Sequence, residues 1–359
     1  MRDGGGAVRA RAVTAAALVL LAAAPARAAT VVIDDQDPPG AGLNDPTAFV
    51  PVGGNTATTL GDARLHVFQQ AASIWGAQLF SVVPIHVSTH FTPLMCTSNS
   101  AVLASTGTTT VHRNFPNALL ADTWYPQALA NALAGTDLDP SNADIQTQFN
   151  SNLGNSGCLT GISWYLGLDA QPGPGQLDML TTVLHEFAHG LGFQSFETVT
   201  SGTEFMGLAD VFLRNSRQLG ATPSDLSAMT DAQRLAANTS DPNLYWSGAN
   251  VEGGASTFTA GLAAGHVRLY APSTVQVGST LSHFSTDLMP NELMEPAYTG
   301  PNRNLTLTLD LLHDVGWPLA PPPAPAVPAS PGAVRWVLAA TLALAAAARL
   351  RRRGGPCVR

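Results

Sequence analysis

Residues 181–197, TTVLHEFAHGLGFQSFE, contain the side chains best suited to chemistry in this sequence. His185 and His189 stand four residues apart with Glu186 between them, which is the H-E-x-x-H pattern. Residues four apart lie on one face of a helix, so the two imidazoles could bind one metal ion while Glu186 reaches a water on it. A catalytic zinc ion takes three protein ligands and leaves a fourth position for water. The pattern therefore predicts a zinc site that lacks one ligand, because Ser195 occupies the position where a third could follow.

The two histidines are expected on a helix that covers about residues 176–190. Apolar residues recur there at steps of three and four, which is the pattern of a helix with one buried face. They are Leu177, Leu180, Leu184, Phe187 and Leu191. Gly190 and Gly192 are expected to end the helix, because glycine accepts a left-handed turn that would send the chain back beneath the metal.

A family resemblance supplies one candidate for the missing ligand. The stretch HEFAHGLGF resembles the metzincin zinc-peptidase signature H-E-x-x-H-x-x-G, with Gly192 at the family's glycine. In leishmanolysin-like metzincins a long insertion separates this glycine from the third histidine, and a methionine turn follows. LSHFSTDLMPNELMEP at residues 281–296 is similar to that later motif, so the resemblance implies that His283 is the third ligand and Met294 the turn methionine. TLDLLHDVGW at residues 308–317 resembles the closing helix of such domains.

The residues by themselves leave other third ligands open. A carboxylate from Glu197, Glu204 or Glu252 would complete a site of two histidines and one glutamate. His266 is a further candidate, although the residues after it favour a strand without a nearby turn.

The resemblance implies an α+β fold, with a twisted mixed sheet, an active-site helix and an irregular C-terminal subdomain. It implies Zn²⁺ as the cofactor, bound by His185, His189 and His283. Glu186 is expected to act as the general base in the hydrolysis of a protein or peptide substrate. Two alternatives stay open: a surface module that binds metal without catalysis, and a zinc hydrolase that cleaves another amide bond.

The sequence before the metal-binding helix predicts a helix packed on a sheet. Apolar residues at helical spacing predict a helix over residues 62–79, and VVPIHVSTHF at residues 82–91 has the composition of a strand. Alternation of Ile145, Thr147 and Phe149 with polar residues predicts a half-exposed strand at residues 143–151. This strand could lie at the edge of the sheet, where it could bind an extended peptide as an added strand. GTDLDPSN at residues 135–142 is expected to be a loop.

Both ends of the chain have the composition of targeting segments. Residues 1–28 are predicted to be a signal peptide, with cleavage after Ala28. Residues 319–333 form a Pro-rich linker, and residues 334–359 combine an apolar run with an Arg-rich tail, which indicates an anchor or sorting segment that could tether the protein to a membrane. The protein is therefore expected to be exported and either secreted or anchored to the cell envelope.

Two catalytic subdomains are expected between these ends. Residues 29–192 would form the N-terminal one, and residues 193–318 the C-terminal one, which supplies the third ligand and the methionine turn. Seven arginines and 24 acidic residues give residues 29–319 a formal charge of −17, so no nucleic-acid partner is expected. Cys96 and Cys158 could form a disulfide in an oxidising compartment or remain two buried thiols.

Overall fold

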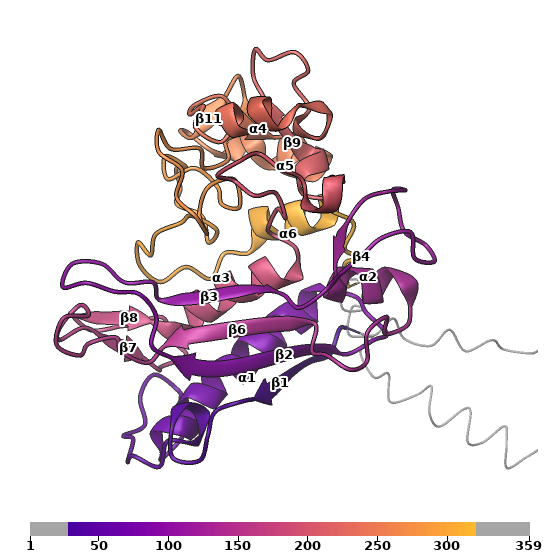
Figure 1. Cartoon of the computed structure of the whole chain (residues 1–359). Helices are drawn as coiled ribbons and strands as arrows, with labels where there is room; N and C mark the ends of the chain where they lie inside the picture. The colour runs from indigo at the N-terminus through magenta and orange to yellow at the C-terminus, as the bar shows by residue number, and fades with distance from the viewer. Residues whose placement is uncertain (1–27, 321–359) are drawn as a thin grey trace, which may run out of the picture. The chain divides into compact units, whose positions relative to one another are not determined.

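A four-stranded mixed sheet forms the centre of the first half of the described chain (Figure 1). The structure is a computed structural model and describes residues 28–320. The strand order is β1 (Val31–Asp35), β2 (Ile85–Thr92), β6 (Ile145–Asn150) and β3 (Ala104–Thr108). β3 runs antiparallel to β6, whereas the other neighbours are parallel. With its helices, the described part of the chain is a mixed α+β structure, as the sequence predicts.

Two long helices pack on this sheet. α1 (Leu60–Gln78) contacts α3 (Met179–Leu191), and α3 in turn contacts β3 and β6. The ring of Phe68 in α1 has its centroid 5.0 Å from that of Phe149 in β6 and 6.1 Å from that of Phe187 in α3. The side chain of Thr59 caps α1 at the amino end. The helix predicted over residues 62–79 is therefore confirmed, with its apolar face in the core.

The strand predicted at residues 143–151 exists, but its expected place at the edge of the sheet is wrong. β6 lies between β2 and β3, and the side chains of Ile145, Thr147 and Phe149 are buried. The alternation reports one buried face of the sheet, and it says nothing about how many neighbours the strand has. Since β3 is the edge strand on this side, β6 has no free edge where a peptide could add.

The helix predicted to carry the metal ligands is shorter at its start than the sequence predicts. Residues Gln176–Asp178 form strand β8, which pairs in parallel with β7 (Ser163–Tyr165), so Leu177 is not on the helix. Gly190 lies inside α3 and does not end it. The end comes at Gly192, whose φ of 126° is open to glycine and unfavourable for other residues.

The chain after α3 consists mostly of short elements and loops, in keeping with the predicted irregular C-terminal part. Its helices are α4 (Asp231–Ala237), α5 (Ala249–Gly254) and α6 (Thr306–Asp314), and its strands are β9 (Ser216–Gln218), β10 (Leu244–Trp246), β11 (Leu262–Ala263) and β12 (His266–Val267). α6 overlaps the predicted closing helix at residues 308–317, but it begins earlier, at Thr306, and ends before Trp317. The remaining elements before α3 are β4 (Val111–His112), β5 (Tyr125–Pro126) and α2 (Gln127–Ala134).

The predicted loop at residues 135–142 is confirmed between α2 and β6. Cys96 and Cys158 form a disulfide with a Cα–Cα distance of 5.1 Å, which settles the choice that the sequence leaves open. No helix within residues 28–320 has both the length and the apolar character that a bilayer crossing requires. The predicted signal peptide up to residue 27, the linker from residue 321 and the anchor lie outside the described residues. The division into subdomains after residue 192 stays a prediction.

Candidate metal centre

The start of α3 is held by a network that no sequence motif predicts. Asp178 caps the helix, accepting hydrogen bonds from the backbone N–H and the hydroxyl of Thr181 at 2.9 and 2.6 Å. The guanidinium of Arg303 donates to both carboxylate oxygens of Asp178, and the Asp178 N–H donates to the phenol oxygen of Tyr298. The segment after the predicted methionine turn therefore fixes the amino end of the helix that carries His185 and His189.

The end of α3 orients one of its histidines. The N–H of Gly192 donates to carbonyls of the last helical turn, and the N–H of Phe193 donates to the carbonyl of Ala188. This turn brings the carbonyl of Phe193 to 2.8 Å from Nδ1 of His189. Gly192 thus has the reversing role that the sequence predicts for it, because its backbone conformation lets the chain fold back onto the helix.

His283 reaches the helix from a loop in the C-terminal part of the chain. Its Nδ1 lies 2.9 Å from the carbonyl of Ser279. The next residue, Phe284, donates its N–H to the carbonyl of Met294 at 2.9 Å. Leu293, just before Met294, presents its carbonyl to Nδ1 of His185 at 2.8 Å. Met294 is fully buried, and its turn connects the loop of His283 with the ring of His185.

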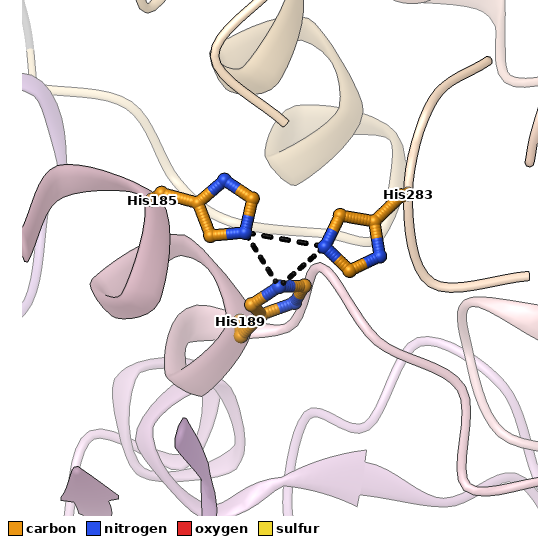
Figure 2. A group of neighbouring side chains, drawn as sticks. All are labelled: His185, His189 and His283. Atoms are coloured by element: carbon orange, nitrogen blue, oxygen red, sulfur yellow. Dashed lines mark hydrogen bonds between the residues drawn. The ribbon is translucent and has the colours of Figure 1, made fainter. Parts of the chain in front are cut away.

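The three imidazoles converge on one point (Figure 2). Their Nε2 atoms lie 3.1 Å apart for His185 and His189, and 3.2 Å apart for each of these with His283. Each Nδ1 faces a backbone carbonyl, so each Nδ1 must carry the proton of the neutral ring. The three Nε2 atoms consequently direct lone pairs at one another, an arrangement that a cation would stabilise.

The spacing of these nitrogens fits a zinc ion. Zn–N bonds of about 2.0–2.1 Å in a tetrahedron place neighbouring nitrogens about 3.3–3.4 Å apart. Three imidazoles would leave the fourth tetrahedral position for water or substrate. Among residues 28–320, this is the single group of three or more His, Cys, Asp or Glu side chains whose ligand atoms come this close together.

Burial keeps the three rings in the neutral form that binds metal. Desolvation lowers the pKa of His189 to about 3, with a smaller contribution from the neighbouring charge of His185. Desolvation also lowers the pKa of His185 and takes that of His283 well below its usual value. The rings are therefore deprotonated at Nε2 across the physiological pH range.

Glu186 is buried next to the histidines, and burial raises the pKa of its carboxyl to about 7. The hydroxyl of Thr106, in the edge strand β3, interacts with this carboxylate and lowers its pKa. Thr106 in turn lies 2.5 Å from the hydroxyl of Thr147 in β6. No sequence pattern places either threonine at the site, since a hydroxyl in a strand has no spacing that marks it as part of a distant site.

The alternative third ligands are engaged elsewhere. Glu197 accepts a hydrogen bond from Asn238, and Glu204 forms an ion pair with Arg234. Glu252 pairs with His266, which makes neither of them a ligand of this group. The structure therefore brings together His185, His189 and His283, as the resemblance implies.

Comparison with known proteins gives one match. No curated protein and no solved structure matches the chain. A family model described as SPBPB7E8-like matches residues 64–252, which include His185, Glu186 and His189 but not His283. Because this match spans more than half of the 359 residues, the chain belongs to the SPBPB7E8-like family.

Proposed function

We propose that this protein is an exported zinc-dependent endopeptidase of the metzincin type, most similar to the leishmanolysin-like branch. The observation that carries the proposal is the convergence of three Nε2 lone pairs beside a buried glutamate. The helix of the first two histidines, the distant third histidine and the methionine turn support the same assignment. The disulfide supports export, because disulfides persist in oxidising compartments.

Glu186 is the residue that moves the proton. A zinc ion on the three imidazoles would supply a water of lowered pKa and would polarise the carbonyl of the bond to be cleaved. Glu186 accepts the proton of the attacking water at its carboxylate and then donates it to the departing amine. The raised pKa of about 7 supports this role, since the group must take up and release a proton near neutral pH.

β3 is the proposed binding strand for an extended substrate. It has a strand neighbour on one side only, and its residue Thr106 interacts with the Glu186 carboxylate. A peptide that adds to the free edge of β3 would therefore pass beside the general base. The sequence suggests β6, at residues 145–150, as the strand that binds the peptide. The proposed strand is instead its neighbour β3, which lies at the edge of the sheet.

The proposal is tested by two substitutions in the purified protein. Glu186→Gln is expected to keep bound zinc and lower peptide hydrolysis by roughly 10²–10⁴-fold, because the metal ligands remain and the base is lost. His283→Ala is expected to lose both zinc and hydrolysis. His266→Ala is the matched control, since this histidine pairs with Glu252 away from the site. Metal content by mass spectrometry and cleavage of a peptide library are the measurements.

The outcomes separate the alternatives. A zinc-loaded protein that cleaves no member of the library would instead be a metal-binding surface module. Cleavage of glycan-linked amides without cleavage of peptides would identify a hydrolase of another amide bond. Full zinc content in His283→Ala would rule out the proposed ligand set.

A further inference from the structure

A buried glutamate and a buried asparagine face each other beyond the metal-binding helix. Glu197 is 6% exposed and Asn238 is 0% exposed. The amide Nδ2 of Asn238 donates to Oε1 of Glu197 at 2.7 Å. The other oxygen of each side chain, Oε2 of Glu197 and Oδ1 of Asn238, is buried and has no hydrogen-bond partner among residues 28–320. Two acceptors are thus unsatisfied within one directly bonded pair.

The orientation of the asparagine amide is fixed by its surroundings. Nδ2 also donates to the carbonyl of Val199 at 3.0 Å, so both amide protons have acceptors. Turning the amide over would place its oxygen against Oε1 and the Val199 carbonyl, which are both acceptors. The missing partner is therefore a donor, and one proton on Oε2 of Glu197 would supply it to Oδ1 of Asn238.

We propose that Glu197 is protonated in the folded protein, that it forms a two-hydrogen-bond ring with Asn238, and that this ring is a proton-dependent clamp. The clamp joins residues 195–199, which follow the exit of α3, to Asn238 at the carboxyl end of α4. The inference concerns this segment and holds whether or not the metal centre is a peptidase.

The charges around Glu197 favour the protonated form. Burial raises the pKa of Glu197 to about 7, and the carboxylates of Asp210 and Glu204 add to the rise. Arg234 of α4 and the Asn238 amide act in the opposite direction. However, the guanidinium of Arg234 is committed to the carbonyls of Gly202 and Met229 and to the carboxylate of Asp231.

Ionisation would therefore open the clamp. A charged Oε2 without a donor in a buried site is costly, and Oδ1 of Asn238 would lack a donor as well. The segment that leaves α3 would lose one of its hydrogen bonds to α4 as the pH rises through neutrality, while the carbonyl of Val199 still accepts from Asn238 Nδ2. Below that pH the ring stays closed and adds to stability, because a carboxyl with a raised pKa favours the folded state while it is protonated.

Glu197→Gln is the substitution that tests the ring. Its side-chain carbonyl can accept from Asn238 Nδ2, and its amide can donate to Asn238 Oδ1, so glutamine makes both hydrogen bonds without a titrating proton. The melting temperature of the wild type relative to E197Q is expected to fall by several degrees between pH 6 and pH 8.5. Amide hydrogen exchange of residues 195–203, corrected for intrinsic rates, is expected to accelerate over the same range in the wild type alone.

An infrared measurement tests the protonation itself and does not depend on stability. The spectrum of the wild type minus that of E197Q at pH 5 should contain the C=O band of a protonated carboxyl, and this band should disappear by pH 9. A carboxylate band at pH 5 would overturn the proposal, as would a constant difference in melting temperature. If calcium chloride at pH 8 raised the melting temperature of the wild type but not that of E197Q, the oxygen pair would be a cation site, and the clamp would be excluded.

Discussion

At the scale of single residues, the Glu186 carboxylate depends on two threonines in neighbouring strands. Thr147 is fully buried, and its hydroxyl has one partner, the hydroxyl of Thr106 at 2.5 Å. If the Thr147 hydroxyl donates its proton to the Thr106 oxygen, the Thr106 hydroxyl can donate its own proton to the Glu186 carboxylate. The reverse direction would leave the Thr147 proton without an acceptor. Only the first direction gives hydrogen bonds to both hydroxyls and to the Glu186 carboxylate. Thr106 is therefore a positioning residue for the proposed general base.

This relay predicts different effects of two substitutions at Thr106. Thr106→Val keeps the shape of the side chain but removes the hydroxyl, and it is expected to lower kcat by roughly tenfold, with little change in KM, because a hydrogen bond to a charged group is lost. Thr106→Ser should retain most of kcat. Steady-state kinetics on one peptide measures both, with Ser105→Ala on the exposed side of β3 as the control. Equal losses in the valine and serine variants would mean that the methyl group matters and the hydroxyl does not.

At the scale of elements, the approach of α3 to the sheet requires a glycine. A Cβ atom at Gly190 would lie 2.3 Å from Cγ2 of Ile145 in β6, which is closer than carbon atoms can pack. α3 therefore lies against β6 at the turn that carries His189. The predicted place of Gly190 at the end of the helix is wrong, because a glycine for close packing and a glycine for a turn look the same in a sequence.

Gly190→Ala is expected to destabilise the fold by about 1–3 kcal/mol, since an overpacked core forces side chains and backbone apart. Gly253→Ala in α5 is the matched control, because nothing lies within 4 Å of a Cβ there, and alanine should be neutral or stabilising. Urea denaturation gives the free energy of unfolding of both variants. Combining Gly190→Ala with Ile145→Ala should recover part of the loss, and strict additivity of the two changes would contradict the proposed clash.

Helices and strands with one buried face can be predicted from the sequence, whereas their arrangement in space cannot. The apolar spacing in α1 and α3 identifies both helices, because that spacing is a local property of the chain. The place of β6 between two strands depends on partners far away in the sequence, and alternation does not encode it. Likewise, no spacing connects His189 with His283, which lie 94 residues apart, and only a resemblance to a known motif suggests their meeting. The carbonyls that orient the three rings are backbone groups, which every residue has.

At the scale of the whole molecule, buried carboxyl groups make stability depend on pH. Asp144, at the start of β6, is 3% exposed and accepts hydrogen bonds from the His86 N–H and the Asn131 amide, both at 2.7 Å. Burial nevertheless raises its pKa to about 6. The folded state thus holds this proton more tightly than the unfolded state does. Its contribution to stability is present at low pH and is lost as the pH rises from about 4 to 6.

Asp144→Asn is expected to remove this part of the pH dependence. The free energy of unfolding of the wild type should fall between pH 4 and pH 6 by roughly 2 kcal/mol more than that of the variant. Asparagine has one acceptor oxygen fewer than aspartate, so the variant should be less stable at every pH. The prediction therefore compares how steeply the free energy of unfolding changes with pH in the two proteins. Urea titrations across this pH range measure both slopes. Parallel curves would show that Asp144 is ionised throughout.

The sequence distance between the three histidines sets an order of events for the newly made chain. Residue 283 follows His185 by 98 positions, so a chain that emerges amino end first presents two imidazoles long before the last one arrives. Two donors on a helix cannot form the three-nitrogen cage, and the carbonyls of Ser279 and Leu293, which aim two of the rings, come equally late. On the proposed function, a partly synthesised or partly translocated chain therefore lacks a complete metal site. The proposed site becomes complete only when the carboxyl-terminal third of the chain has emerged.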